Sequence, residues 1–262
     1  MLVKKIVSLL YIFFVLAIGL AILGRAFIGR GATDSATLAP AKGVGQTDAN
    51  LVSITWQDKN YQAYYVKVDE TSKVDLIANF EEKLTAEQIK VKYNCASLVS
   101  GGFYTTDAKP TGFFLSDEKT LRNFANSKLF DGVLSVNDFA TPRITRSIPQ
   151  DHLKFGLQTG PILLENAALI KLSLNSDEPA RRVLAAVTGE NILYFIVIFN
   201  PEQVYDGPYL ADLPGILSEI GKQTGISFAD AVNLDGGSAS AFYAGEKTFS
   251  ELSSVGSAFC IK

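Results

Sequence analysis

The chemistry of this sequence centres on one acidic residue beside two consecutive glycines. Asp235 follows the apolar run 229–234, and Gly236 and Gly237 come directly after it. Such glycines let the backbone adopt positive φ angles and approach a ligand closely, while a strand holds the carboxylate in a fixed direction. The pattern predicts a strand, a tight glycine turn and a second strand over 239–243, with Asp235 as a candidate catalytic residue.

The same segment has a simpler interpretation. Asp-Gly is also a common two-residue hairpin turn, so the segment can merely join two neighbouring strands. A phosphate-binding loop of the nucleotide-binding kind is less favoured, because residues 238–242 contain neither the expected lysine nor the start of a helix. The local sequence leaves the reactive carboxylate and the plain hairpin open.

Two further glycine segments resemble the first in their setting. Gly101 and Gly102 lie in the segment 100–104, and the segment 159–161 leads into the apolar run 162–164. Glycine in a strand often marks an ordinary bulge or turn. Three glycine turns attached to strands nevertheless predict one rim where backbones approach a ligand.

Arg181 and Arg182 stand at the outer end of a predicted strand. This strand forms a hairpin with the apolar run 192–199, which is apolar on both faces like a central strand covered by two layers. Neighbouring side chains of a strand point to opposite faces. One arginine can therefore reach a site while the other is solvated; the alternative is that both are solvated.

The elements that must position these residues suggest a single α+β or mixed α/β domain. Strands over 51–56, 62–68 and 73–80 are predicted as a three-strand meander. Thr85 begins a capping-box pattern that predicts a short helix, and Asp117 is predicted to cap another. A third helix, from Asp212 and Pro214 to Gly225, leads to the strand before Asp235. The expected fold has mixed β-sheets layered by helices.

The first thirty residues are predicted to be a separate unit, a signal anchor. Lys4 and Lys5 precede an apolar stretch over 6–24, and arginines follow it. Nineteen residues of helix span about 28 Å, close to the hydrocarbon core of a bilayer. The alternative is a cleaved signal peptide. Residues 31–50 have the composition of a flexible stalk, which leaves 51–262 as the domain, expected outside the cytoplasm.

Charge, cysteine and histidine content limit the partners, disulfides and cofactors that the domain is expected to have. Without the basic residues of the first thirty, 20 basic side chains stand against 27 acidic ones, which argues against a nucleic-acid partner. Cys95 and Cys260 can form a disulfide in an oxidising exterior; two buried thiols are the alternative. With His152 as the single histidine, expected at the surface, no zinc site is predicted. No cofactor is expected, although a divalent cation held by carboxylates would leave no signature.

The segment around Asp235 also resembles a family motif. Residues 233–237, with Ser238 and Ser240, are similar to the Asn-Leu-Asp-Gly-Gly-Gly-Ser-Ser motif of the phosphodiester glycosidases, a domain family that includes many bacterial envelope proteins. Residues 101–104 resemble its Asn-Gly-Gly-Phe-Phe segment, and residues 159–161 its Gly-Pro segment. Arg182 resembles the arginine of its Arg-Thr-Ala-Ile-Gly strand. The likeness covers roughly 52–261; the chain departs from the family pattern at Ser100, Val183, Ala186 and Ser238.

The resemblance implies cleavage of a sugar-1-phosphodiester. Arg182, helped by Arg181, would bind the phosphate, and Asp235 would orient water, accept its proton or stabilise an oxocarbenium-like centre. The residues expected to line the substrate site are Asn233, Gly236, Gly237, Ser238, Ser240, Gly101, Gly102, Phe103, Thr159, Gly160 and Arg181. Candidates for a second carboxylate are Asp206, Glu165 and Glu190.

The sequence thus favours a membrane-anchored extracytoplasmic glycosidase that acts on a sugar-phosphate diester, as in a cell-envelope glycan. The alternative is a non-catalytic envelope module that uses the same fold to bind a glycan or another partner.

Overall fold

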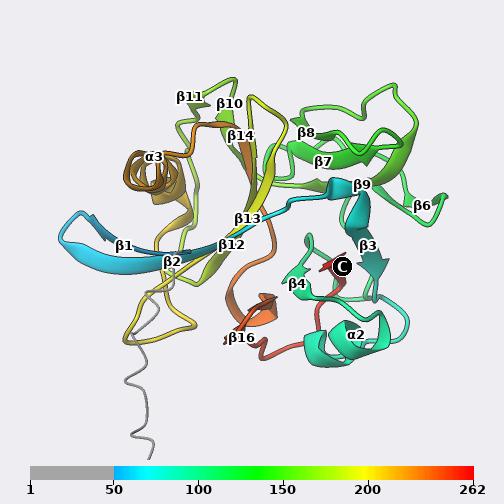
Figure 1. Cartoon of the computed structure of the whole chain (residues 1–262), viewed down its shortest axis with the longest axis horizontal. Coiled ribbons are helices and arrows are strands. Elements are labelled where there is room, and N and C mark those ends of the chain that lie inside the picture. Colours follow the sequence, from blue (N-terminus) through cyan, green and yellow to red (C-terminus); the bar gives the residue numbers. More distant parts are fainter. Residues whose placement is uncertain (1–49) are drawn as a thin grey trace, which may run out of the picture. The chain divides into compact units, whose positions relative to one another are not determined.

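The computed structural model describes residues 50–262, which form the domain in Figure 1. The predicted anchor over 1–30 and all but the last residue of the predicted stalk over 31–50 lie outside the described residues. Within the described residues, no helix combines the length and the apolar character needed to cross a membrane.

The largest sheet has seven strands in the order β1-β2-β13-β12-β14-β10-β11, and every neighbouring pair is antiparallel. Its strands are β1 (Leu51–Trp56), β2 (Lys59–Lys67), β10 (Ile162–Glu165), β11 (Ala168–Leu169), β12 (Arg182–Thr188), β13 (Leu193–Phe199) and β14 (Phe228–Asn233). The predicted hairpin of the arginine strand is confirmed as β12 and β13. All seven residues of β13 are buried, which explains its uninterrupted apolar sequence.

Two five-stranded antiparallel sheets pack beside it. One has the order β16-β15-β4-β17-β3, with β3 (Val74–Ala78), β4 (Ser97–Ser100), β15 (Phe242–Ala244), β16 (Lys247–Phe249) and β17 (Ser257–Ile261). The other has the order β6-β5-β9-β7-β8, with β5 (Phe114–Ser116), β6 (Lys119–Arg122), β7 (Gly132–Asn137), β8 (Pro142–Thr145) and β9 (Leu153–Thr159).

Helices are few in residues 50–262. The α-helices are α2 (Ala86–Lys92) and α3 (Leu213–Thr224), and the short 3-10 turns are η1 (Thr71–Lys73), η2 (Leu210–Asp212) and η3 (Gly237–Ala239). Both predicted helices at these positions are confirmed. Thr85 and Gln88 form the expected capping box of α2, and Gly225 ends α3 with a φ of 73°.

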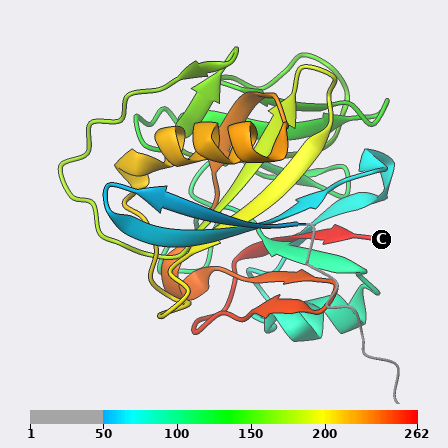
Figure 2. The ribbon, with the colours of Figure 1, turned by 60° about the vertical axis from the view of Figure 1, so that its left-hand side comes forward.

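The core has two main layers, one on each face of the seven-stranded sheet. Figure 2 shows α3 lying across one face, where its apolar stripe packs on β1, β12 and β13. On the other face, side chains of β12, β13 and β14 pack against aromatic residues of the two smaller sheets, including Phe155 and Phe259. The expected layering by helices therefore holds for one face, while sheets cover the other.

Three expectations for the scaffold are wrong. The described sheets are antiparallel throughout rather than mixed. Asp117 does not begin a helix, because it forms the turn between β5 and β6 with Glu118, both at positive φ. The meander ends after β2, since β13 occupies the remaining edge of β2 and β3 pairs with β17 instead.

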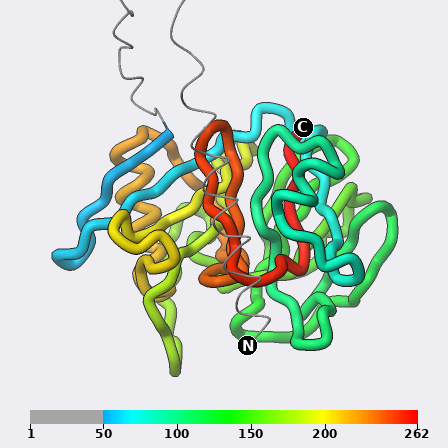
Figure 3. Tube along the Cα trace, turned by 90° about the horizontal axis from the view of Figure 1, so that it is seen from below, coloured from blue at the N-terminus to red at the C-terminus, as the bar shows by residue number. Residues whose placement is uncertain are grey.

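The C-terminal strand is held on both sides and by a covalent bond. β17 lies between β3 and β4, as the red segment beside the cyan and teal segments in Figure 3 shows. Cys260 of β17 is bonded to Cys95, 165 residues earlier, just after α2. The predicted disulfide is confirmed.

Candidate functional site

Asp235 lies where the chain crosses from one sheet to another. β14 belongs to the seven-stranded sheet, whereas β15 belongs to the sheet that contains β4 and β17. The segment between them includes the 3-10 turn η3. The plain-hairpin interpretation is therefore wrong, because the two flanking strands do not pair with each other.

Backbone hydrogen bonds fix the crossing to both sheets. The N–H groups of Leu234 and Gly237 donate to the carbonyls of Val183 and Arg181 on β12, at 2.8 Å each. Between them, the N–H of Asp235 donates to the carbonyl of Gly101 at 2.9 Å. The carboxylate thus leaves the chain at the point where it passes from β12 to the glycine pair after β4.

The third glycine segment joins the same junction. Asn233 donates from its backbone N–H to Pro161 O at 3.0 Å and from its side chain to Gly160 O at 3.1 Å. The hydroxyl of Thr159 donates to Asn233 O at 2.8 Å. The structure therefore brings together the three glycine segments that the sequence places far apart.

The two glycines that follow Asp235 occupy positions that other residues do not fit. A Cβ atom on Gly236 would lie 2.9 Å from the carbonyl oxygen of Arg181. Gly237 has a φ of 60°, a conformation that residues with side chains rarely adopt. The turn can therefore approach β12 closely only because glycine occupies both positions.

Burial sets the acidity of Asp235. The side chain is half-buried, and desolvation raises the pKa of Asp235 to about 7, opposed only by the N–H of Gly236. No side chain among residues 50–262 donates a hydrogen bond to this carboxylate. A carboxyl group with a pKa near neutrality can exchange protons at the pH of most cells, which is a property of catalytic acids and bases.

Arg182 is anchored but keeps donors unused. Its Nε donates to Pro208 O at 3.1 Å, and its Nη2 donates to the carboxylate of Asp177 at 3.2 Å and to the carbonyl of Glu178. No acceptor within the described part of the chain meets Nη1. The side chain is 13% exposed. The guanidinium is thus held in one orientation, with the two N–H donors of Nη1 available to an anion.

Arg182 and Asp235 are neighbours without being an ion pair. The pairing of Leu184 with Asn233, continued along both strands, sets Arg182 opposite Asp235. Cδ of Arg182 lies 3.8 Å from the position of a Cβ on Gly236. Since adjacent Cα atoms are about 3.8 Å apart, Cα of Asp235 lies within roughly 9 Å of that side chain. No arginine contributes to the pKa shift of Asp235, so each charged group can act on a different part of one ligand.

Arg181, expected to help bind the phosphate, is buried and bonded to other parts of the chain. It is 1% exposed, so the alternative of a wholly solvated arginine pair is wrong. Its guanidinium donates to Oγ and O of Ser240 at 2.7 and 2.6 Å and to Ser250 O at 2.7 Å, and it stacks 4.7 Å from the ring centre of Tyr205. The Ser240 hydroxyl in turn donates to Gly237 O at 2.6 Å. Arg181 and Ser240, both predicted to bind substrate, hold the glycine turn in place.

The other predicted site residues surround the turn. Ser238 is exposed at its surface, and its carbonyl accepts from the N–H groups of Leu252 and Ser253. Phe103 is half-buried and packs 5.1 Å from the ring centre of Phe130, next to Gly102. Ser100 is 1% exposed and directs its hydroxyl to the carbonyl of Asp235 at 3.4 Å, so it supports the backbone at this position.

The candidates for a second carboxylate lie on three different segments. Glu165 is bound by both oxygens to Arg146, at 2.8 and 2.9 Å, beside the start of β14. Glu190 is exposed in the turn at the far end of β12. Asp206 accepts from the N–H of Gly207 and lies in the loop that follows β13.

Asp177 is an acidic residue beside Arg182 that no sequence pattern indicates. Besides Arg182, it accepts the backbone N–H groups of Leu210 and Ala211, both at 2.9 Å. It therefore ties the arginine to the η2 turn that precedes α3. No motif surrounds Asp177 in the sequence, so only its contact with Arg182 reveals it.

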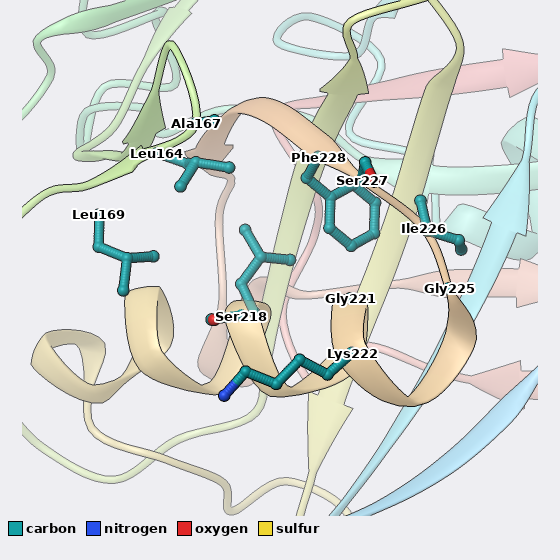
Figure 4. Close-up of a pocket in the computed structure, with 11 residues that line it drawn as sticks. Leu164, Ala167, Leu169, Ser218, Gly221, Lys222, Gly225, Ile226, Ser227 and Phe228 are labelled. Carbon is teal, nitrogen blue, oxygen red and sulfur yellow. The ribbon is translucent and has the colours of Figure 1, made fainter.

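A hollow of about 540 Å³ lies elsewhere, between α3 and the β10–β11 turn. Figure 4 shows that Leu164, Leu169 and Phe228 contribute to its lining, with Lys222 at its edge. Phe228 begins β14 and Asp235 follows its end, so the two are separated by roughly 20 Å of strand. This hollow contains no carboxylate and is separate from the Asp235 junction.

Comparisons with known proteins identify the family of this chain and proteins that share its fold. The family model of the phosphodiester glycosidases matches residues 93–262. No curated protein matches the sequence. Among solved structures, the catalytic domain of zebrafish N-acetylglucosamine-1-phosphodiester alpha-N-acetylglucosaminidase, auto-inhibited by its pro-peptide, superposes with a TM-score of 0.64 and 14% identity over 80% of this chain and 81% of that one. A hypothetical protein from Synechocystis gives a TM-score of 0.52 and 12% identity over 81% of this chain and 61% of its own. At these identities the superpositions show a shared fold.

Proposed function

This chain belongs to the phosphodiester glycosidase family, and from that premise we propose that it hydrolyses a sugar-1-phosphodiester at the junction of Asp235 and Arg182. The observation that carries the proposal is the position of two unlike groups on neighbouring chain segments at the end of β14. A carboxyl group with a pKa near 7 lies opposite an arginine with unused donors on β12. The two groups suit the two halves of the bond that is cleaved.

Arg182 supplies the phosphate contact in this proposal. A phosphodiester carries one negative charge at neutral pH, and the fork of N–H donors on arginine matches its oxygens. Asp177, Glu178 and Pro208 hold the side chain, so little conformational entropy is lost when the anion binds. The N–H groups of the glycine turn add donors of the kind that concave backbone segments offer to anions.

Asp235 acts at the sugar. The phosphate is already a good leaving group, so the reaction has little need of a strong general acid. The ionised carboxylate orients a water molecule, accepts its proton, or stabilises positive charge that develops at the anomeric carbon. Because Arg182 lowers the charge on the phosphate while Asp235 acts on the other side of the bond, both stabilise the same transition state.

The name of a structural relative suggests which sugar the substrate contains. The zebrafish protein is named for N-acetylglucosamine-1-phosphodiester, so that diester is the first substrate to test. We further propose that the domain acts outside the cytoplasm on a cell-envelope glycan, held at the membrane by residues 6–24. The disulfide between Cys95 and Cys260 supports an oxidising location.

A glycan-binding module without activity is the second candidate. One observation favours it: Ser100, which stands where the family pattern has asparagine, is buried and bonded to the backbone, and offers nothing to a ligand. Such a module would bind the diester without cleaving it.

The test is release of N-acetylglucosamine from its 1-phosphate methyl diester by the full-length chain. We expect turnover by the parent, loss of about a thousand-fold or more in Asp235→Asn, and no change in Glu190→Gln, whose carboxyl group lies at the far end of β12. Arg182→Lys should keep more activity than Arg182→Gln, because it retains the charge. Equal rates for the parent and Asp235→Asn would contradict the proposal, and binding without turnover by the parent would support the glycan-binding module.

A further inference from the structure

Asp177 places a fixed negative charge beside the arginine that is proposed to bind the phosphate. Its carboxylate accepts from Nη2 of Arg182 at 3.2 Å, and the two side chains are only 15% and 13% exposed. The backbone N–H groups of Leu210 and Ala211 donate to the same carboxylate, each at 2.9 Å. Because donors from two chain segments hold this carboxylate, it cannot swing away when an anion arrives.

The contact with Asp177 offsets the charge of Arg182 without using up its donors. Burial lowers the pKa of Arg182, and the carboxylate of Asp177 is the charge that opposes this shift. The two N–H donors of Nη1, which meet no acceptor among residues 50–262, remain available to a ligand. The arginine therefore offers hydrogen bonds to an anion, while the pair as a whole has no net charge.

No second cation in the described part of the chain bonds to either member of this pair. Arg181 points to the opposite side from Arg182, where it donates to Ser240. Asp235, opposite Arg182, has a pKa of about 7 and adds a further negative charge above that pH. At pH 8 the negative charges in contact with Arg182 or opposite it therefore outnumber its one positive charge.

Phosphate esters differ in the charge that they bring to such a site. A phosphodiester carries one negative charge, whereas a phosphomonoester carries nearly two at pH 8, because its second pKa is about 6. A phosphate oxygen bonded to Nη1 would lie roughly 6 Å from the carboxylate of Asp177, since Nη1 and Nη2 share one carbon. At that separation and an effective dielectric constant of about 20, each added negative charge weakens binding about ten-fold or more.

From this arrangement we propose that Asp177 makes the junction selective for singly charged phosphodiesters over doubly charged sugar-1-phosphates. The inference rests on the proposed function and adds the residue that sets its substrate class. Selectivity of this kind comes from repelling the wrong ligand rather than from tighter binding of the right one. Cleavage at the anomeric carbon converts the diester into a sugar and a phosphomonoester, so the same repulsion favours release of the phosphate product.

The test compares two ligands of the full-length chain at pH 8: the methyl diester of N-acetylglucosamine-1-phosphate, and N-acetylglucosamine-1-phosphate itself. For the parent we expect the monoester to inhibit weakly, with a Ki about ten-fold above the KM of the diester. Asp177→Asn keeps an oxygen acceptor but removes the charge, so it should lower that Ki about ten-fold. The kcat/KM for the diester should fall about three-fold, because Arg182 is held less firmly.

Glu178→Gln is the matched control, since its exposed side chain carries the same charge and Arg182 bonds only to its backbone carbonyl. Both constants should stay within about two-fold of the parent. A parent that binds the monoester as tightly as the diester, or an Asp177→Asn variant in which both ligands weaken together, would overturn the inference. Should the parent cleave no diester, the proposed function fails, and calorimetric binding of the two ligands decides the role of Asp177: loss of a preference for the diester in Asp177→Asn supports it, and an unchanged preference contradicts it.

Discussion

Asp235 carries its charge at a position where burial opposes ionisation. In the folded chain the pKa is about 7, against an ordinary value of 3.8. Between pH 4 and pH 7 the carboxyl group of the folded state keeps a proton that the unfolded state has lost. The contribution of Asp235 to the free energy of unfolding therefore falls as the pH rises through this range, and it remains destabilising above pH 7. The domain tolerates this cost because the turn is fixed by its bonds to β12 and Gly101.

Replacing Asp235 by asparagine should change the stability of the domain in a way that depends on pH. Asp235→Asn removes the buried charge, so at pH 8 the variant should be more stable than the parent by about 1 to 3 kcal/mol, allowing for partial exposure. Near pH 4 the parent carboxyl is protonated and the difference should disappear. Urea unfolding at the two pH values measures it. A variant that is less stable at pH 8 would show that the carboxylate has a stabilising partner.

The sequence indicates Asp235 as a site residue, but it does not show which contacts each of the two arginines makes. The glycine pair and the preceding apolar run indicate Asp235 directly, because both express local backbone requirements. The roles of Arg181 and Arg182 could not be separated in the same way, since adjacent arginines have the same chemistry. Only the tertiary contacts show that Ser240 and Ser250 satisfy Arg181, while Arg182 retains donors.

Among the elements, the ladder between β12 and β14 holds the site. It ends at Asn233, after which the backbone bonds alternately to Val183, Gly101 and Arg181. This alternation requires the two chains to approach more closely than a side chain allows. Gly236 meets that requirement, since any Cβ there would contact the carbonyl of Arg181.

Gly236→Ala should therefore impair function more than folding. The added methyl group pushes the turn away from β12, weakens the bond from Gly237 to Arg181, and displaces Asp235. We expect kcat/KM to fall about ten-fold or more, since small displacements of reacting groups reduce rates strongly, with a loss of about 1 to 2 kcal/mol in stability.

Gly189→Ala is the control for this variant, because no atom lies within 4 Å of the added Cβ in the turn between β12 and β13. It should match the parent in rate and in unfolding midpoint. If the two alanine variants had the same activity, close approach at Gly236 would not matter.

At the scale of the whole molecule, three antiparallel sheets meet at one junction. Sequence predicts the strands β1, β2, β3, β12, β13, β14 and β15, both α-helices and the disulfide, because these depend on local patterns and on two cysteines. It does not predict which sheet each strand joins. β3 follows β2 closely in sequence yet pairs with β17, and β15 follows the Asp235 turn yet leaves the sheet of β14. Such partners depend on which edges other strands already occupy.

The disulfide closes this arrangement at the C-terminus. It joins residues 165 positions apart, and a loop of that length loses much of its entropy in the unfolded state when it is closed. The double variant Cys95→Ala/Cys260→Ala should therefore be less stable by about 3 to 5 kcal/mol. Denaturant unfolding of the variant and of the oxidised parent measures the difference. Equal stabilities would mean that β17 is held by its two neighbouring strands alone.

The central claim is that the domain breaks the bond between a sugar and a phosphate at Asp235. Hydrolysis of the N-acetylglucosamine-1-phosphate methyl diester in ¹⁸O-labelled water tests it most directly, because the label marks the atom that water attacks. We predict label on the anomeric carbon of the released sugar, with unlabelled methyl phosphate, and no release by Asp235→Asn. Label on the phosphate, or labelled sugar released equally fast by Asp235→Asn, would contradict the account.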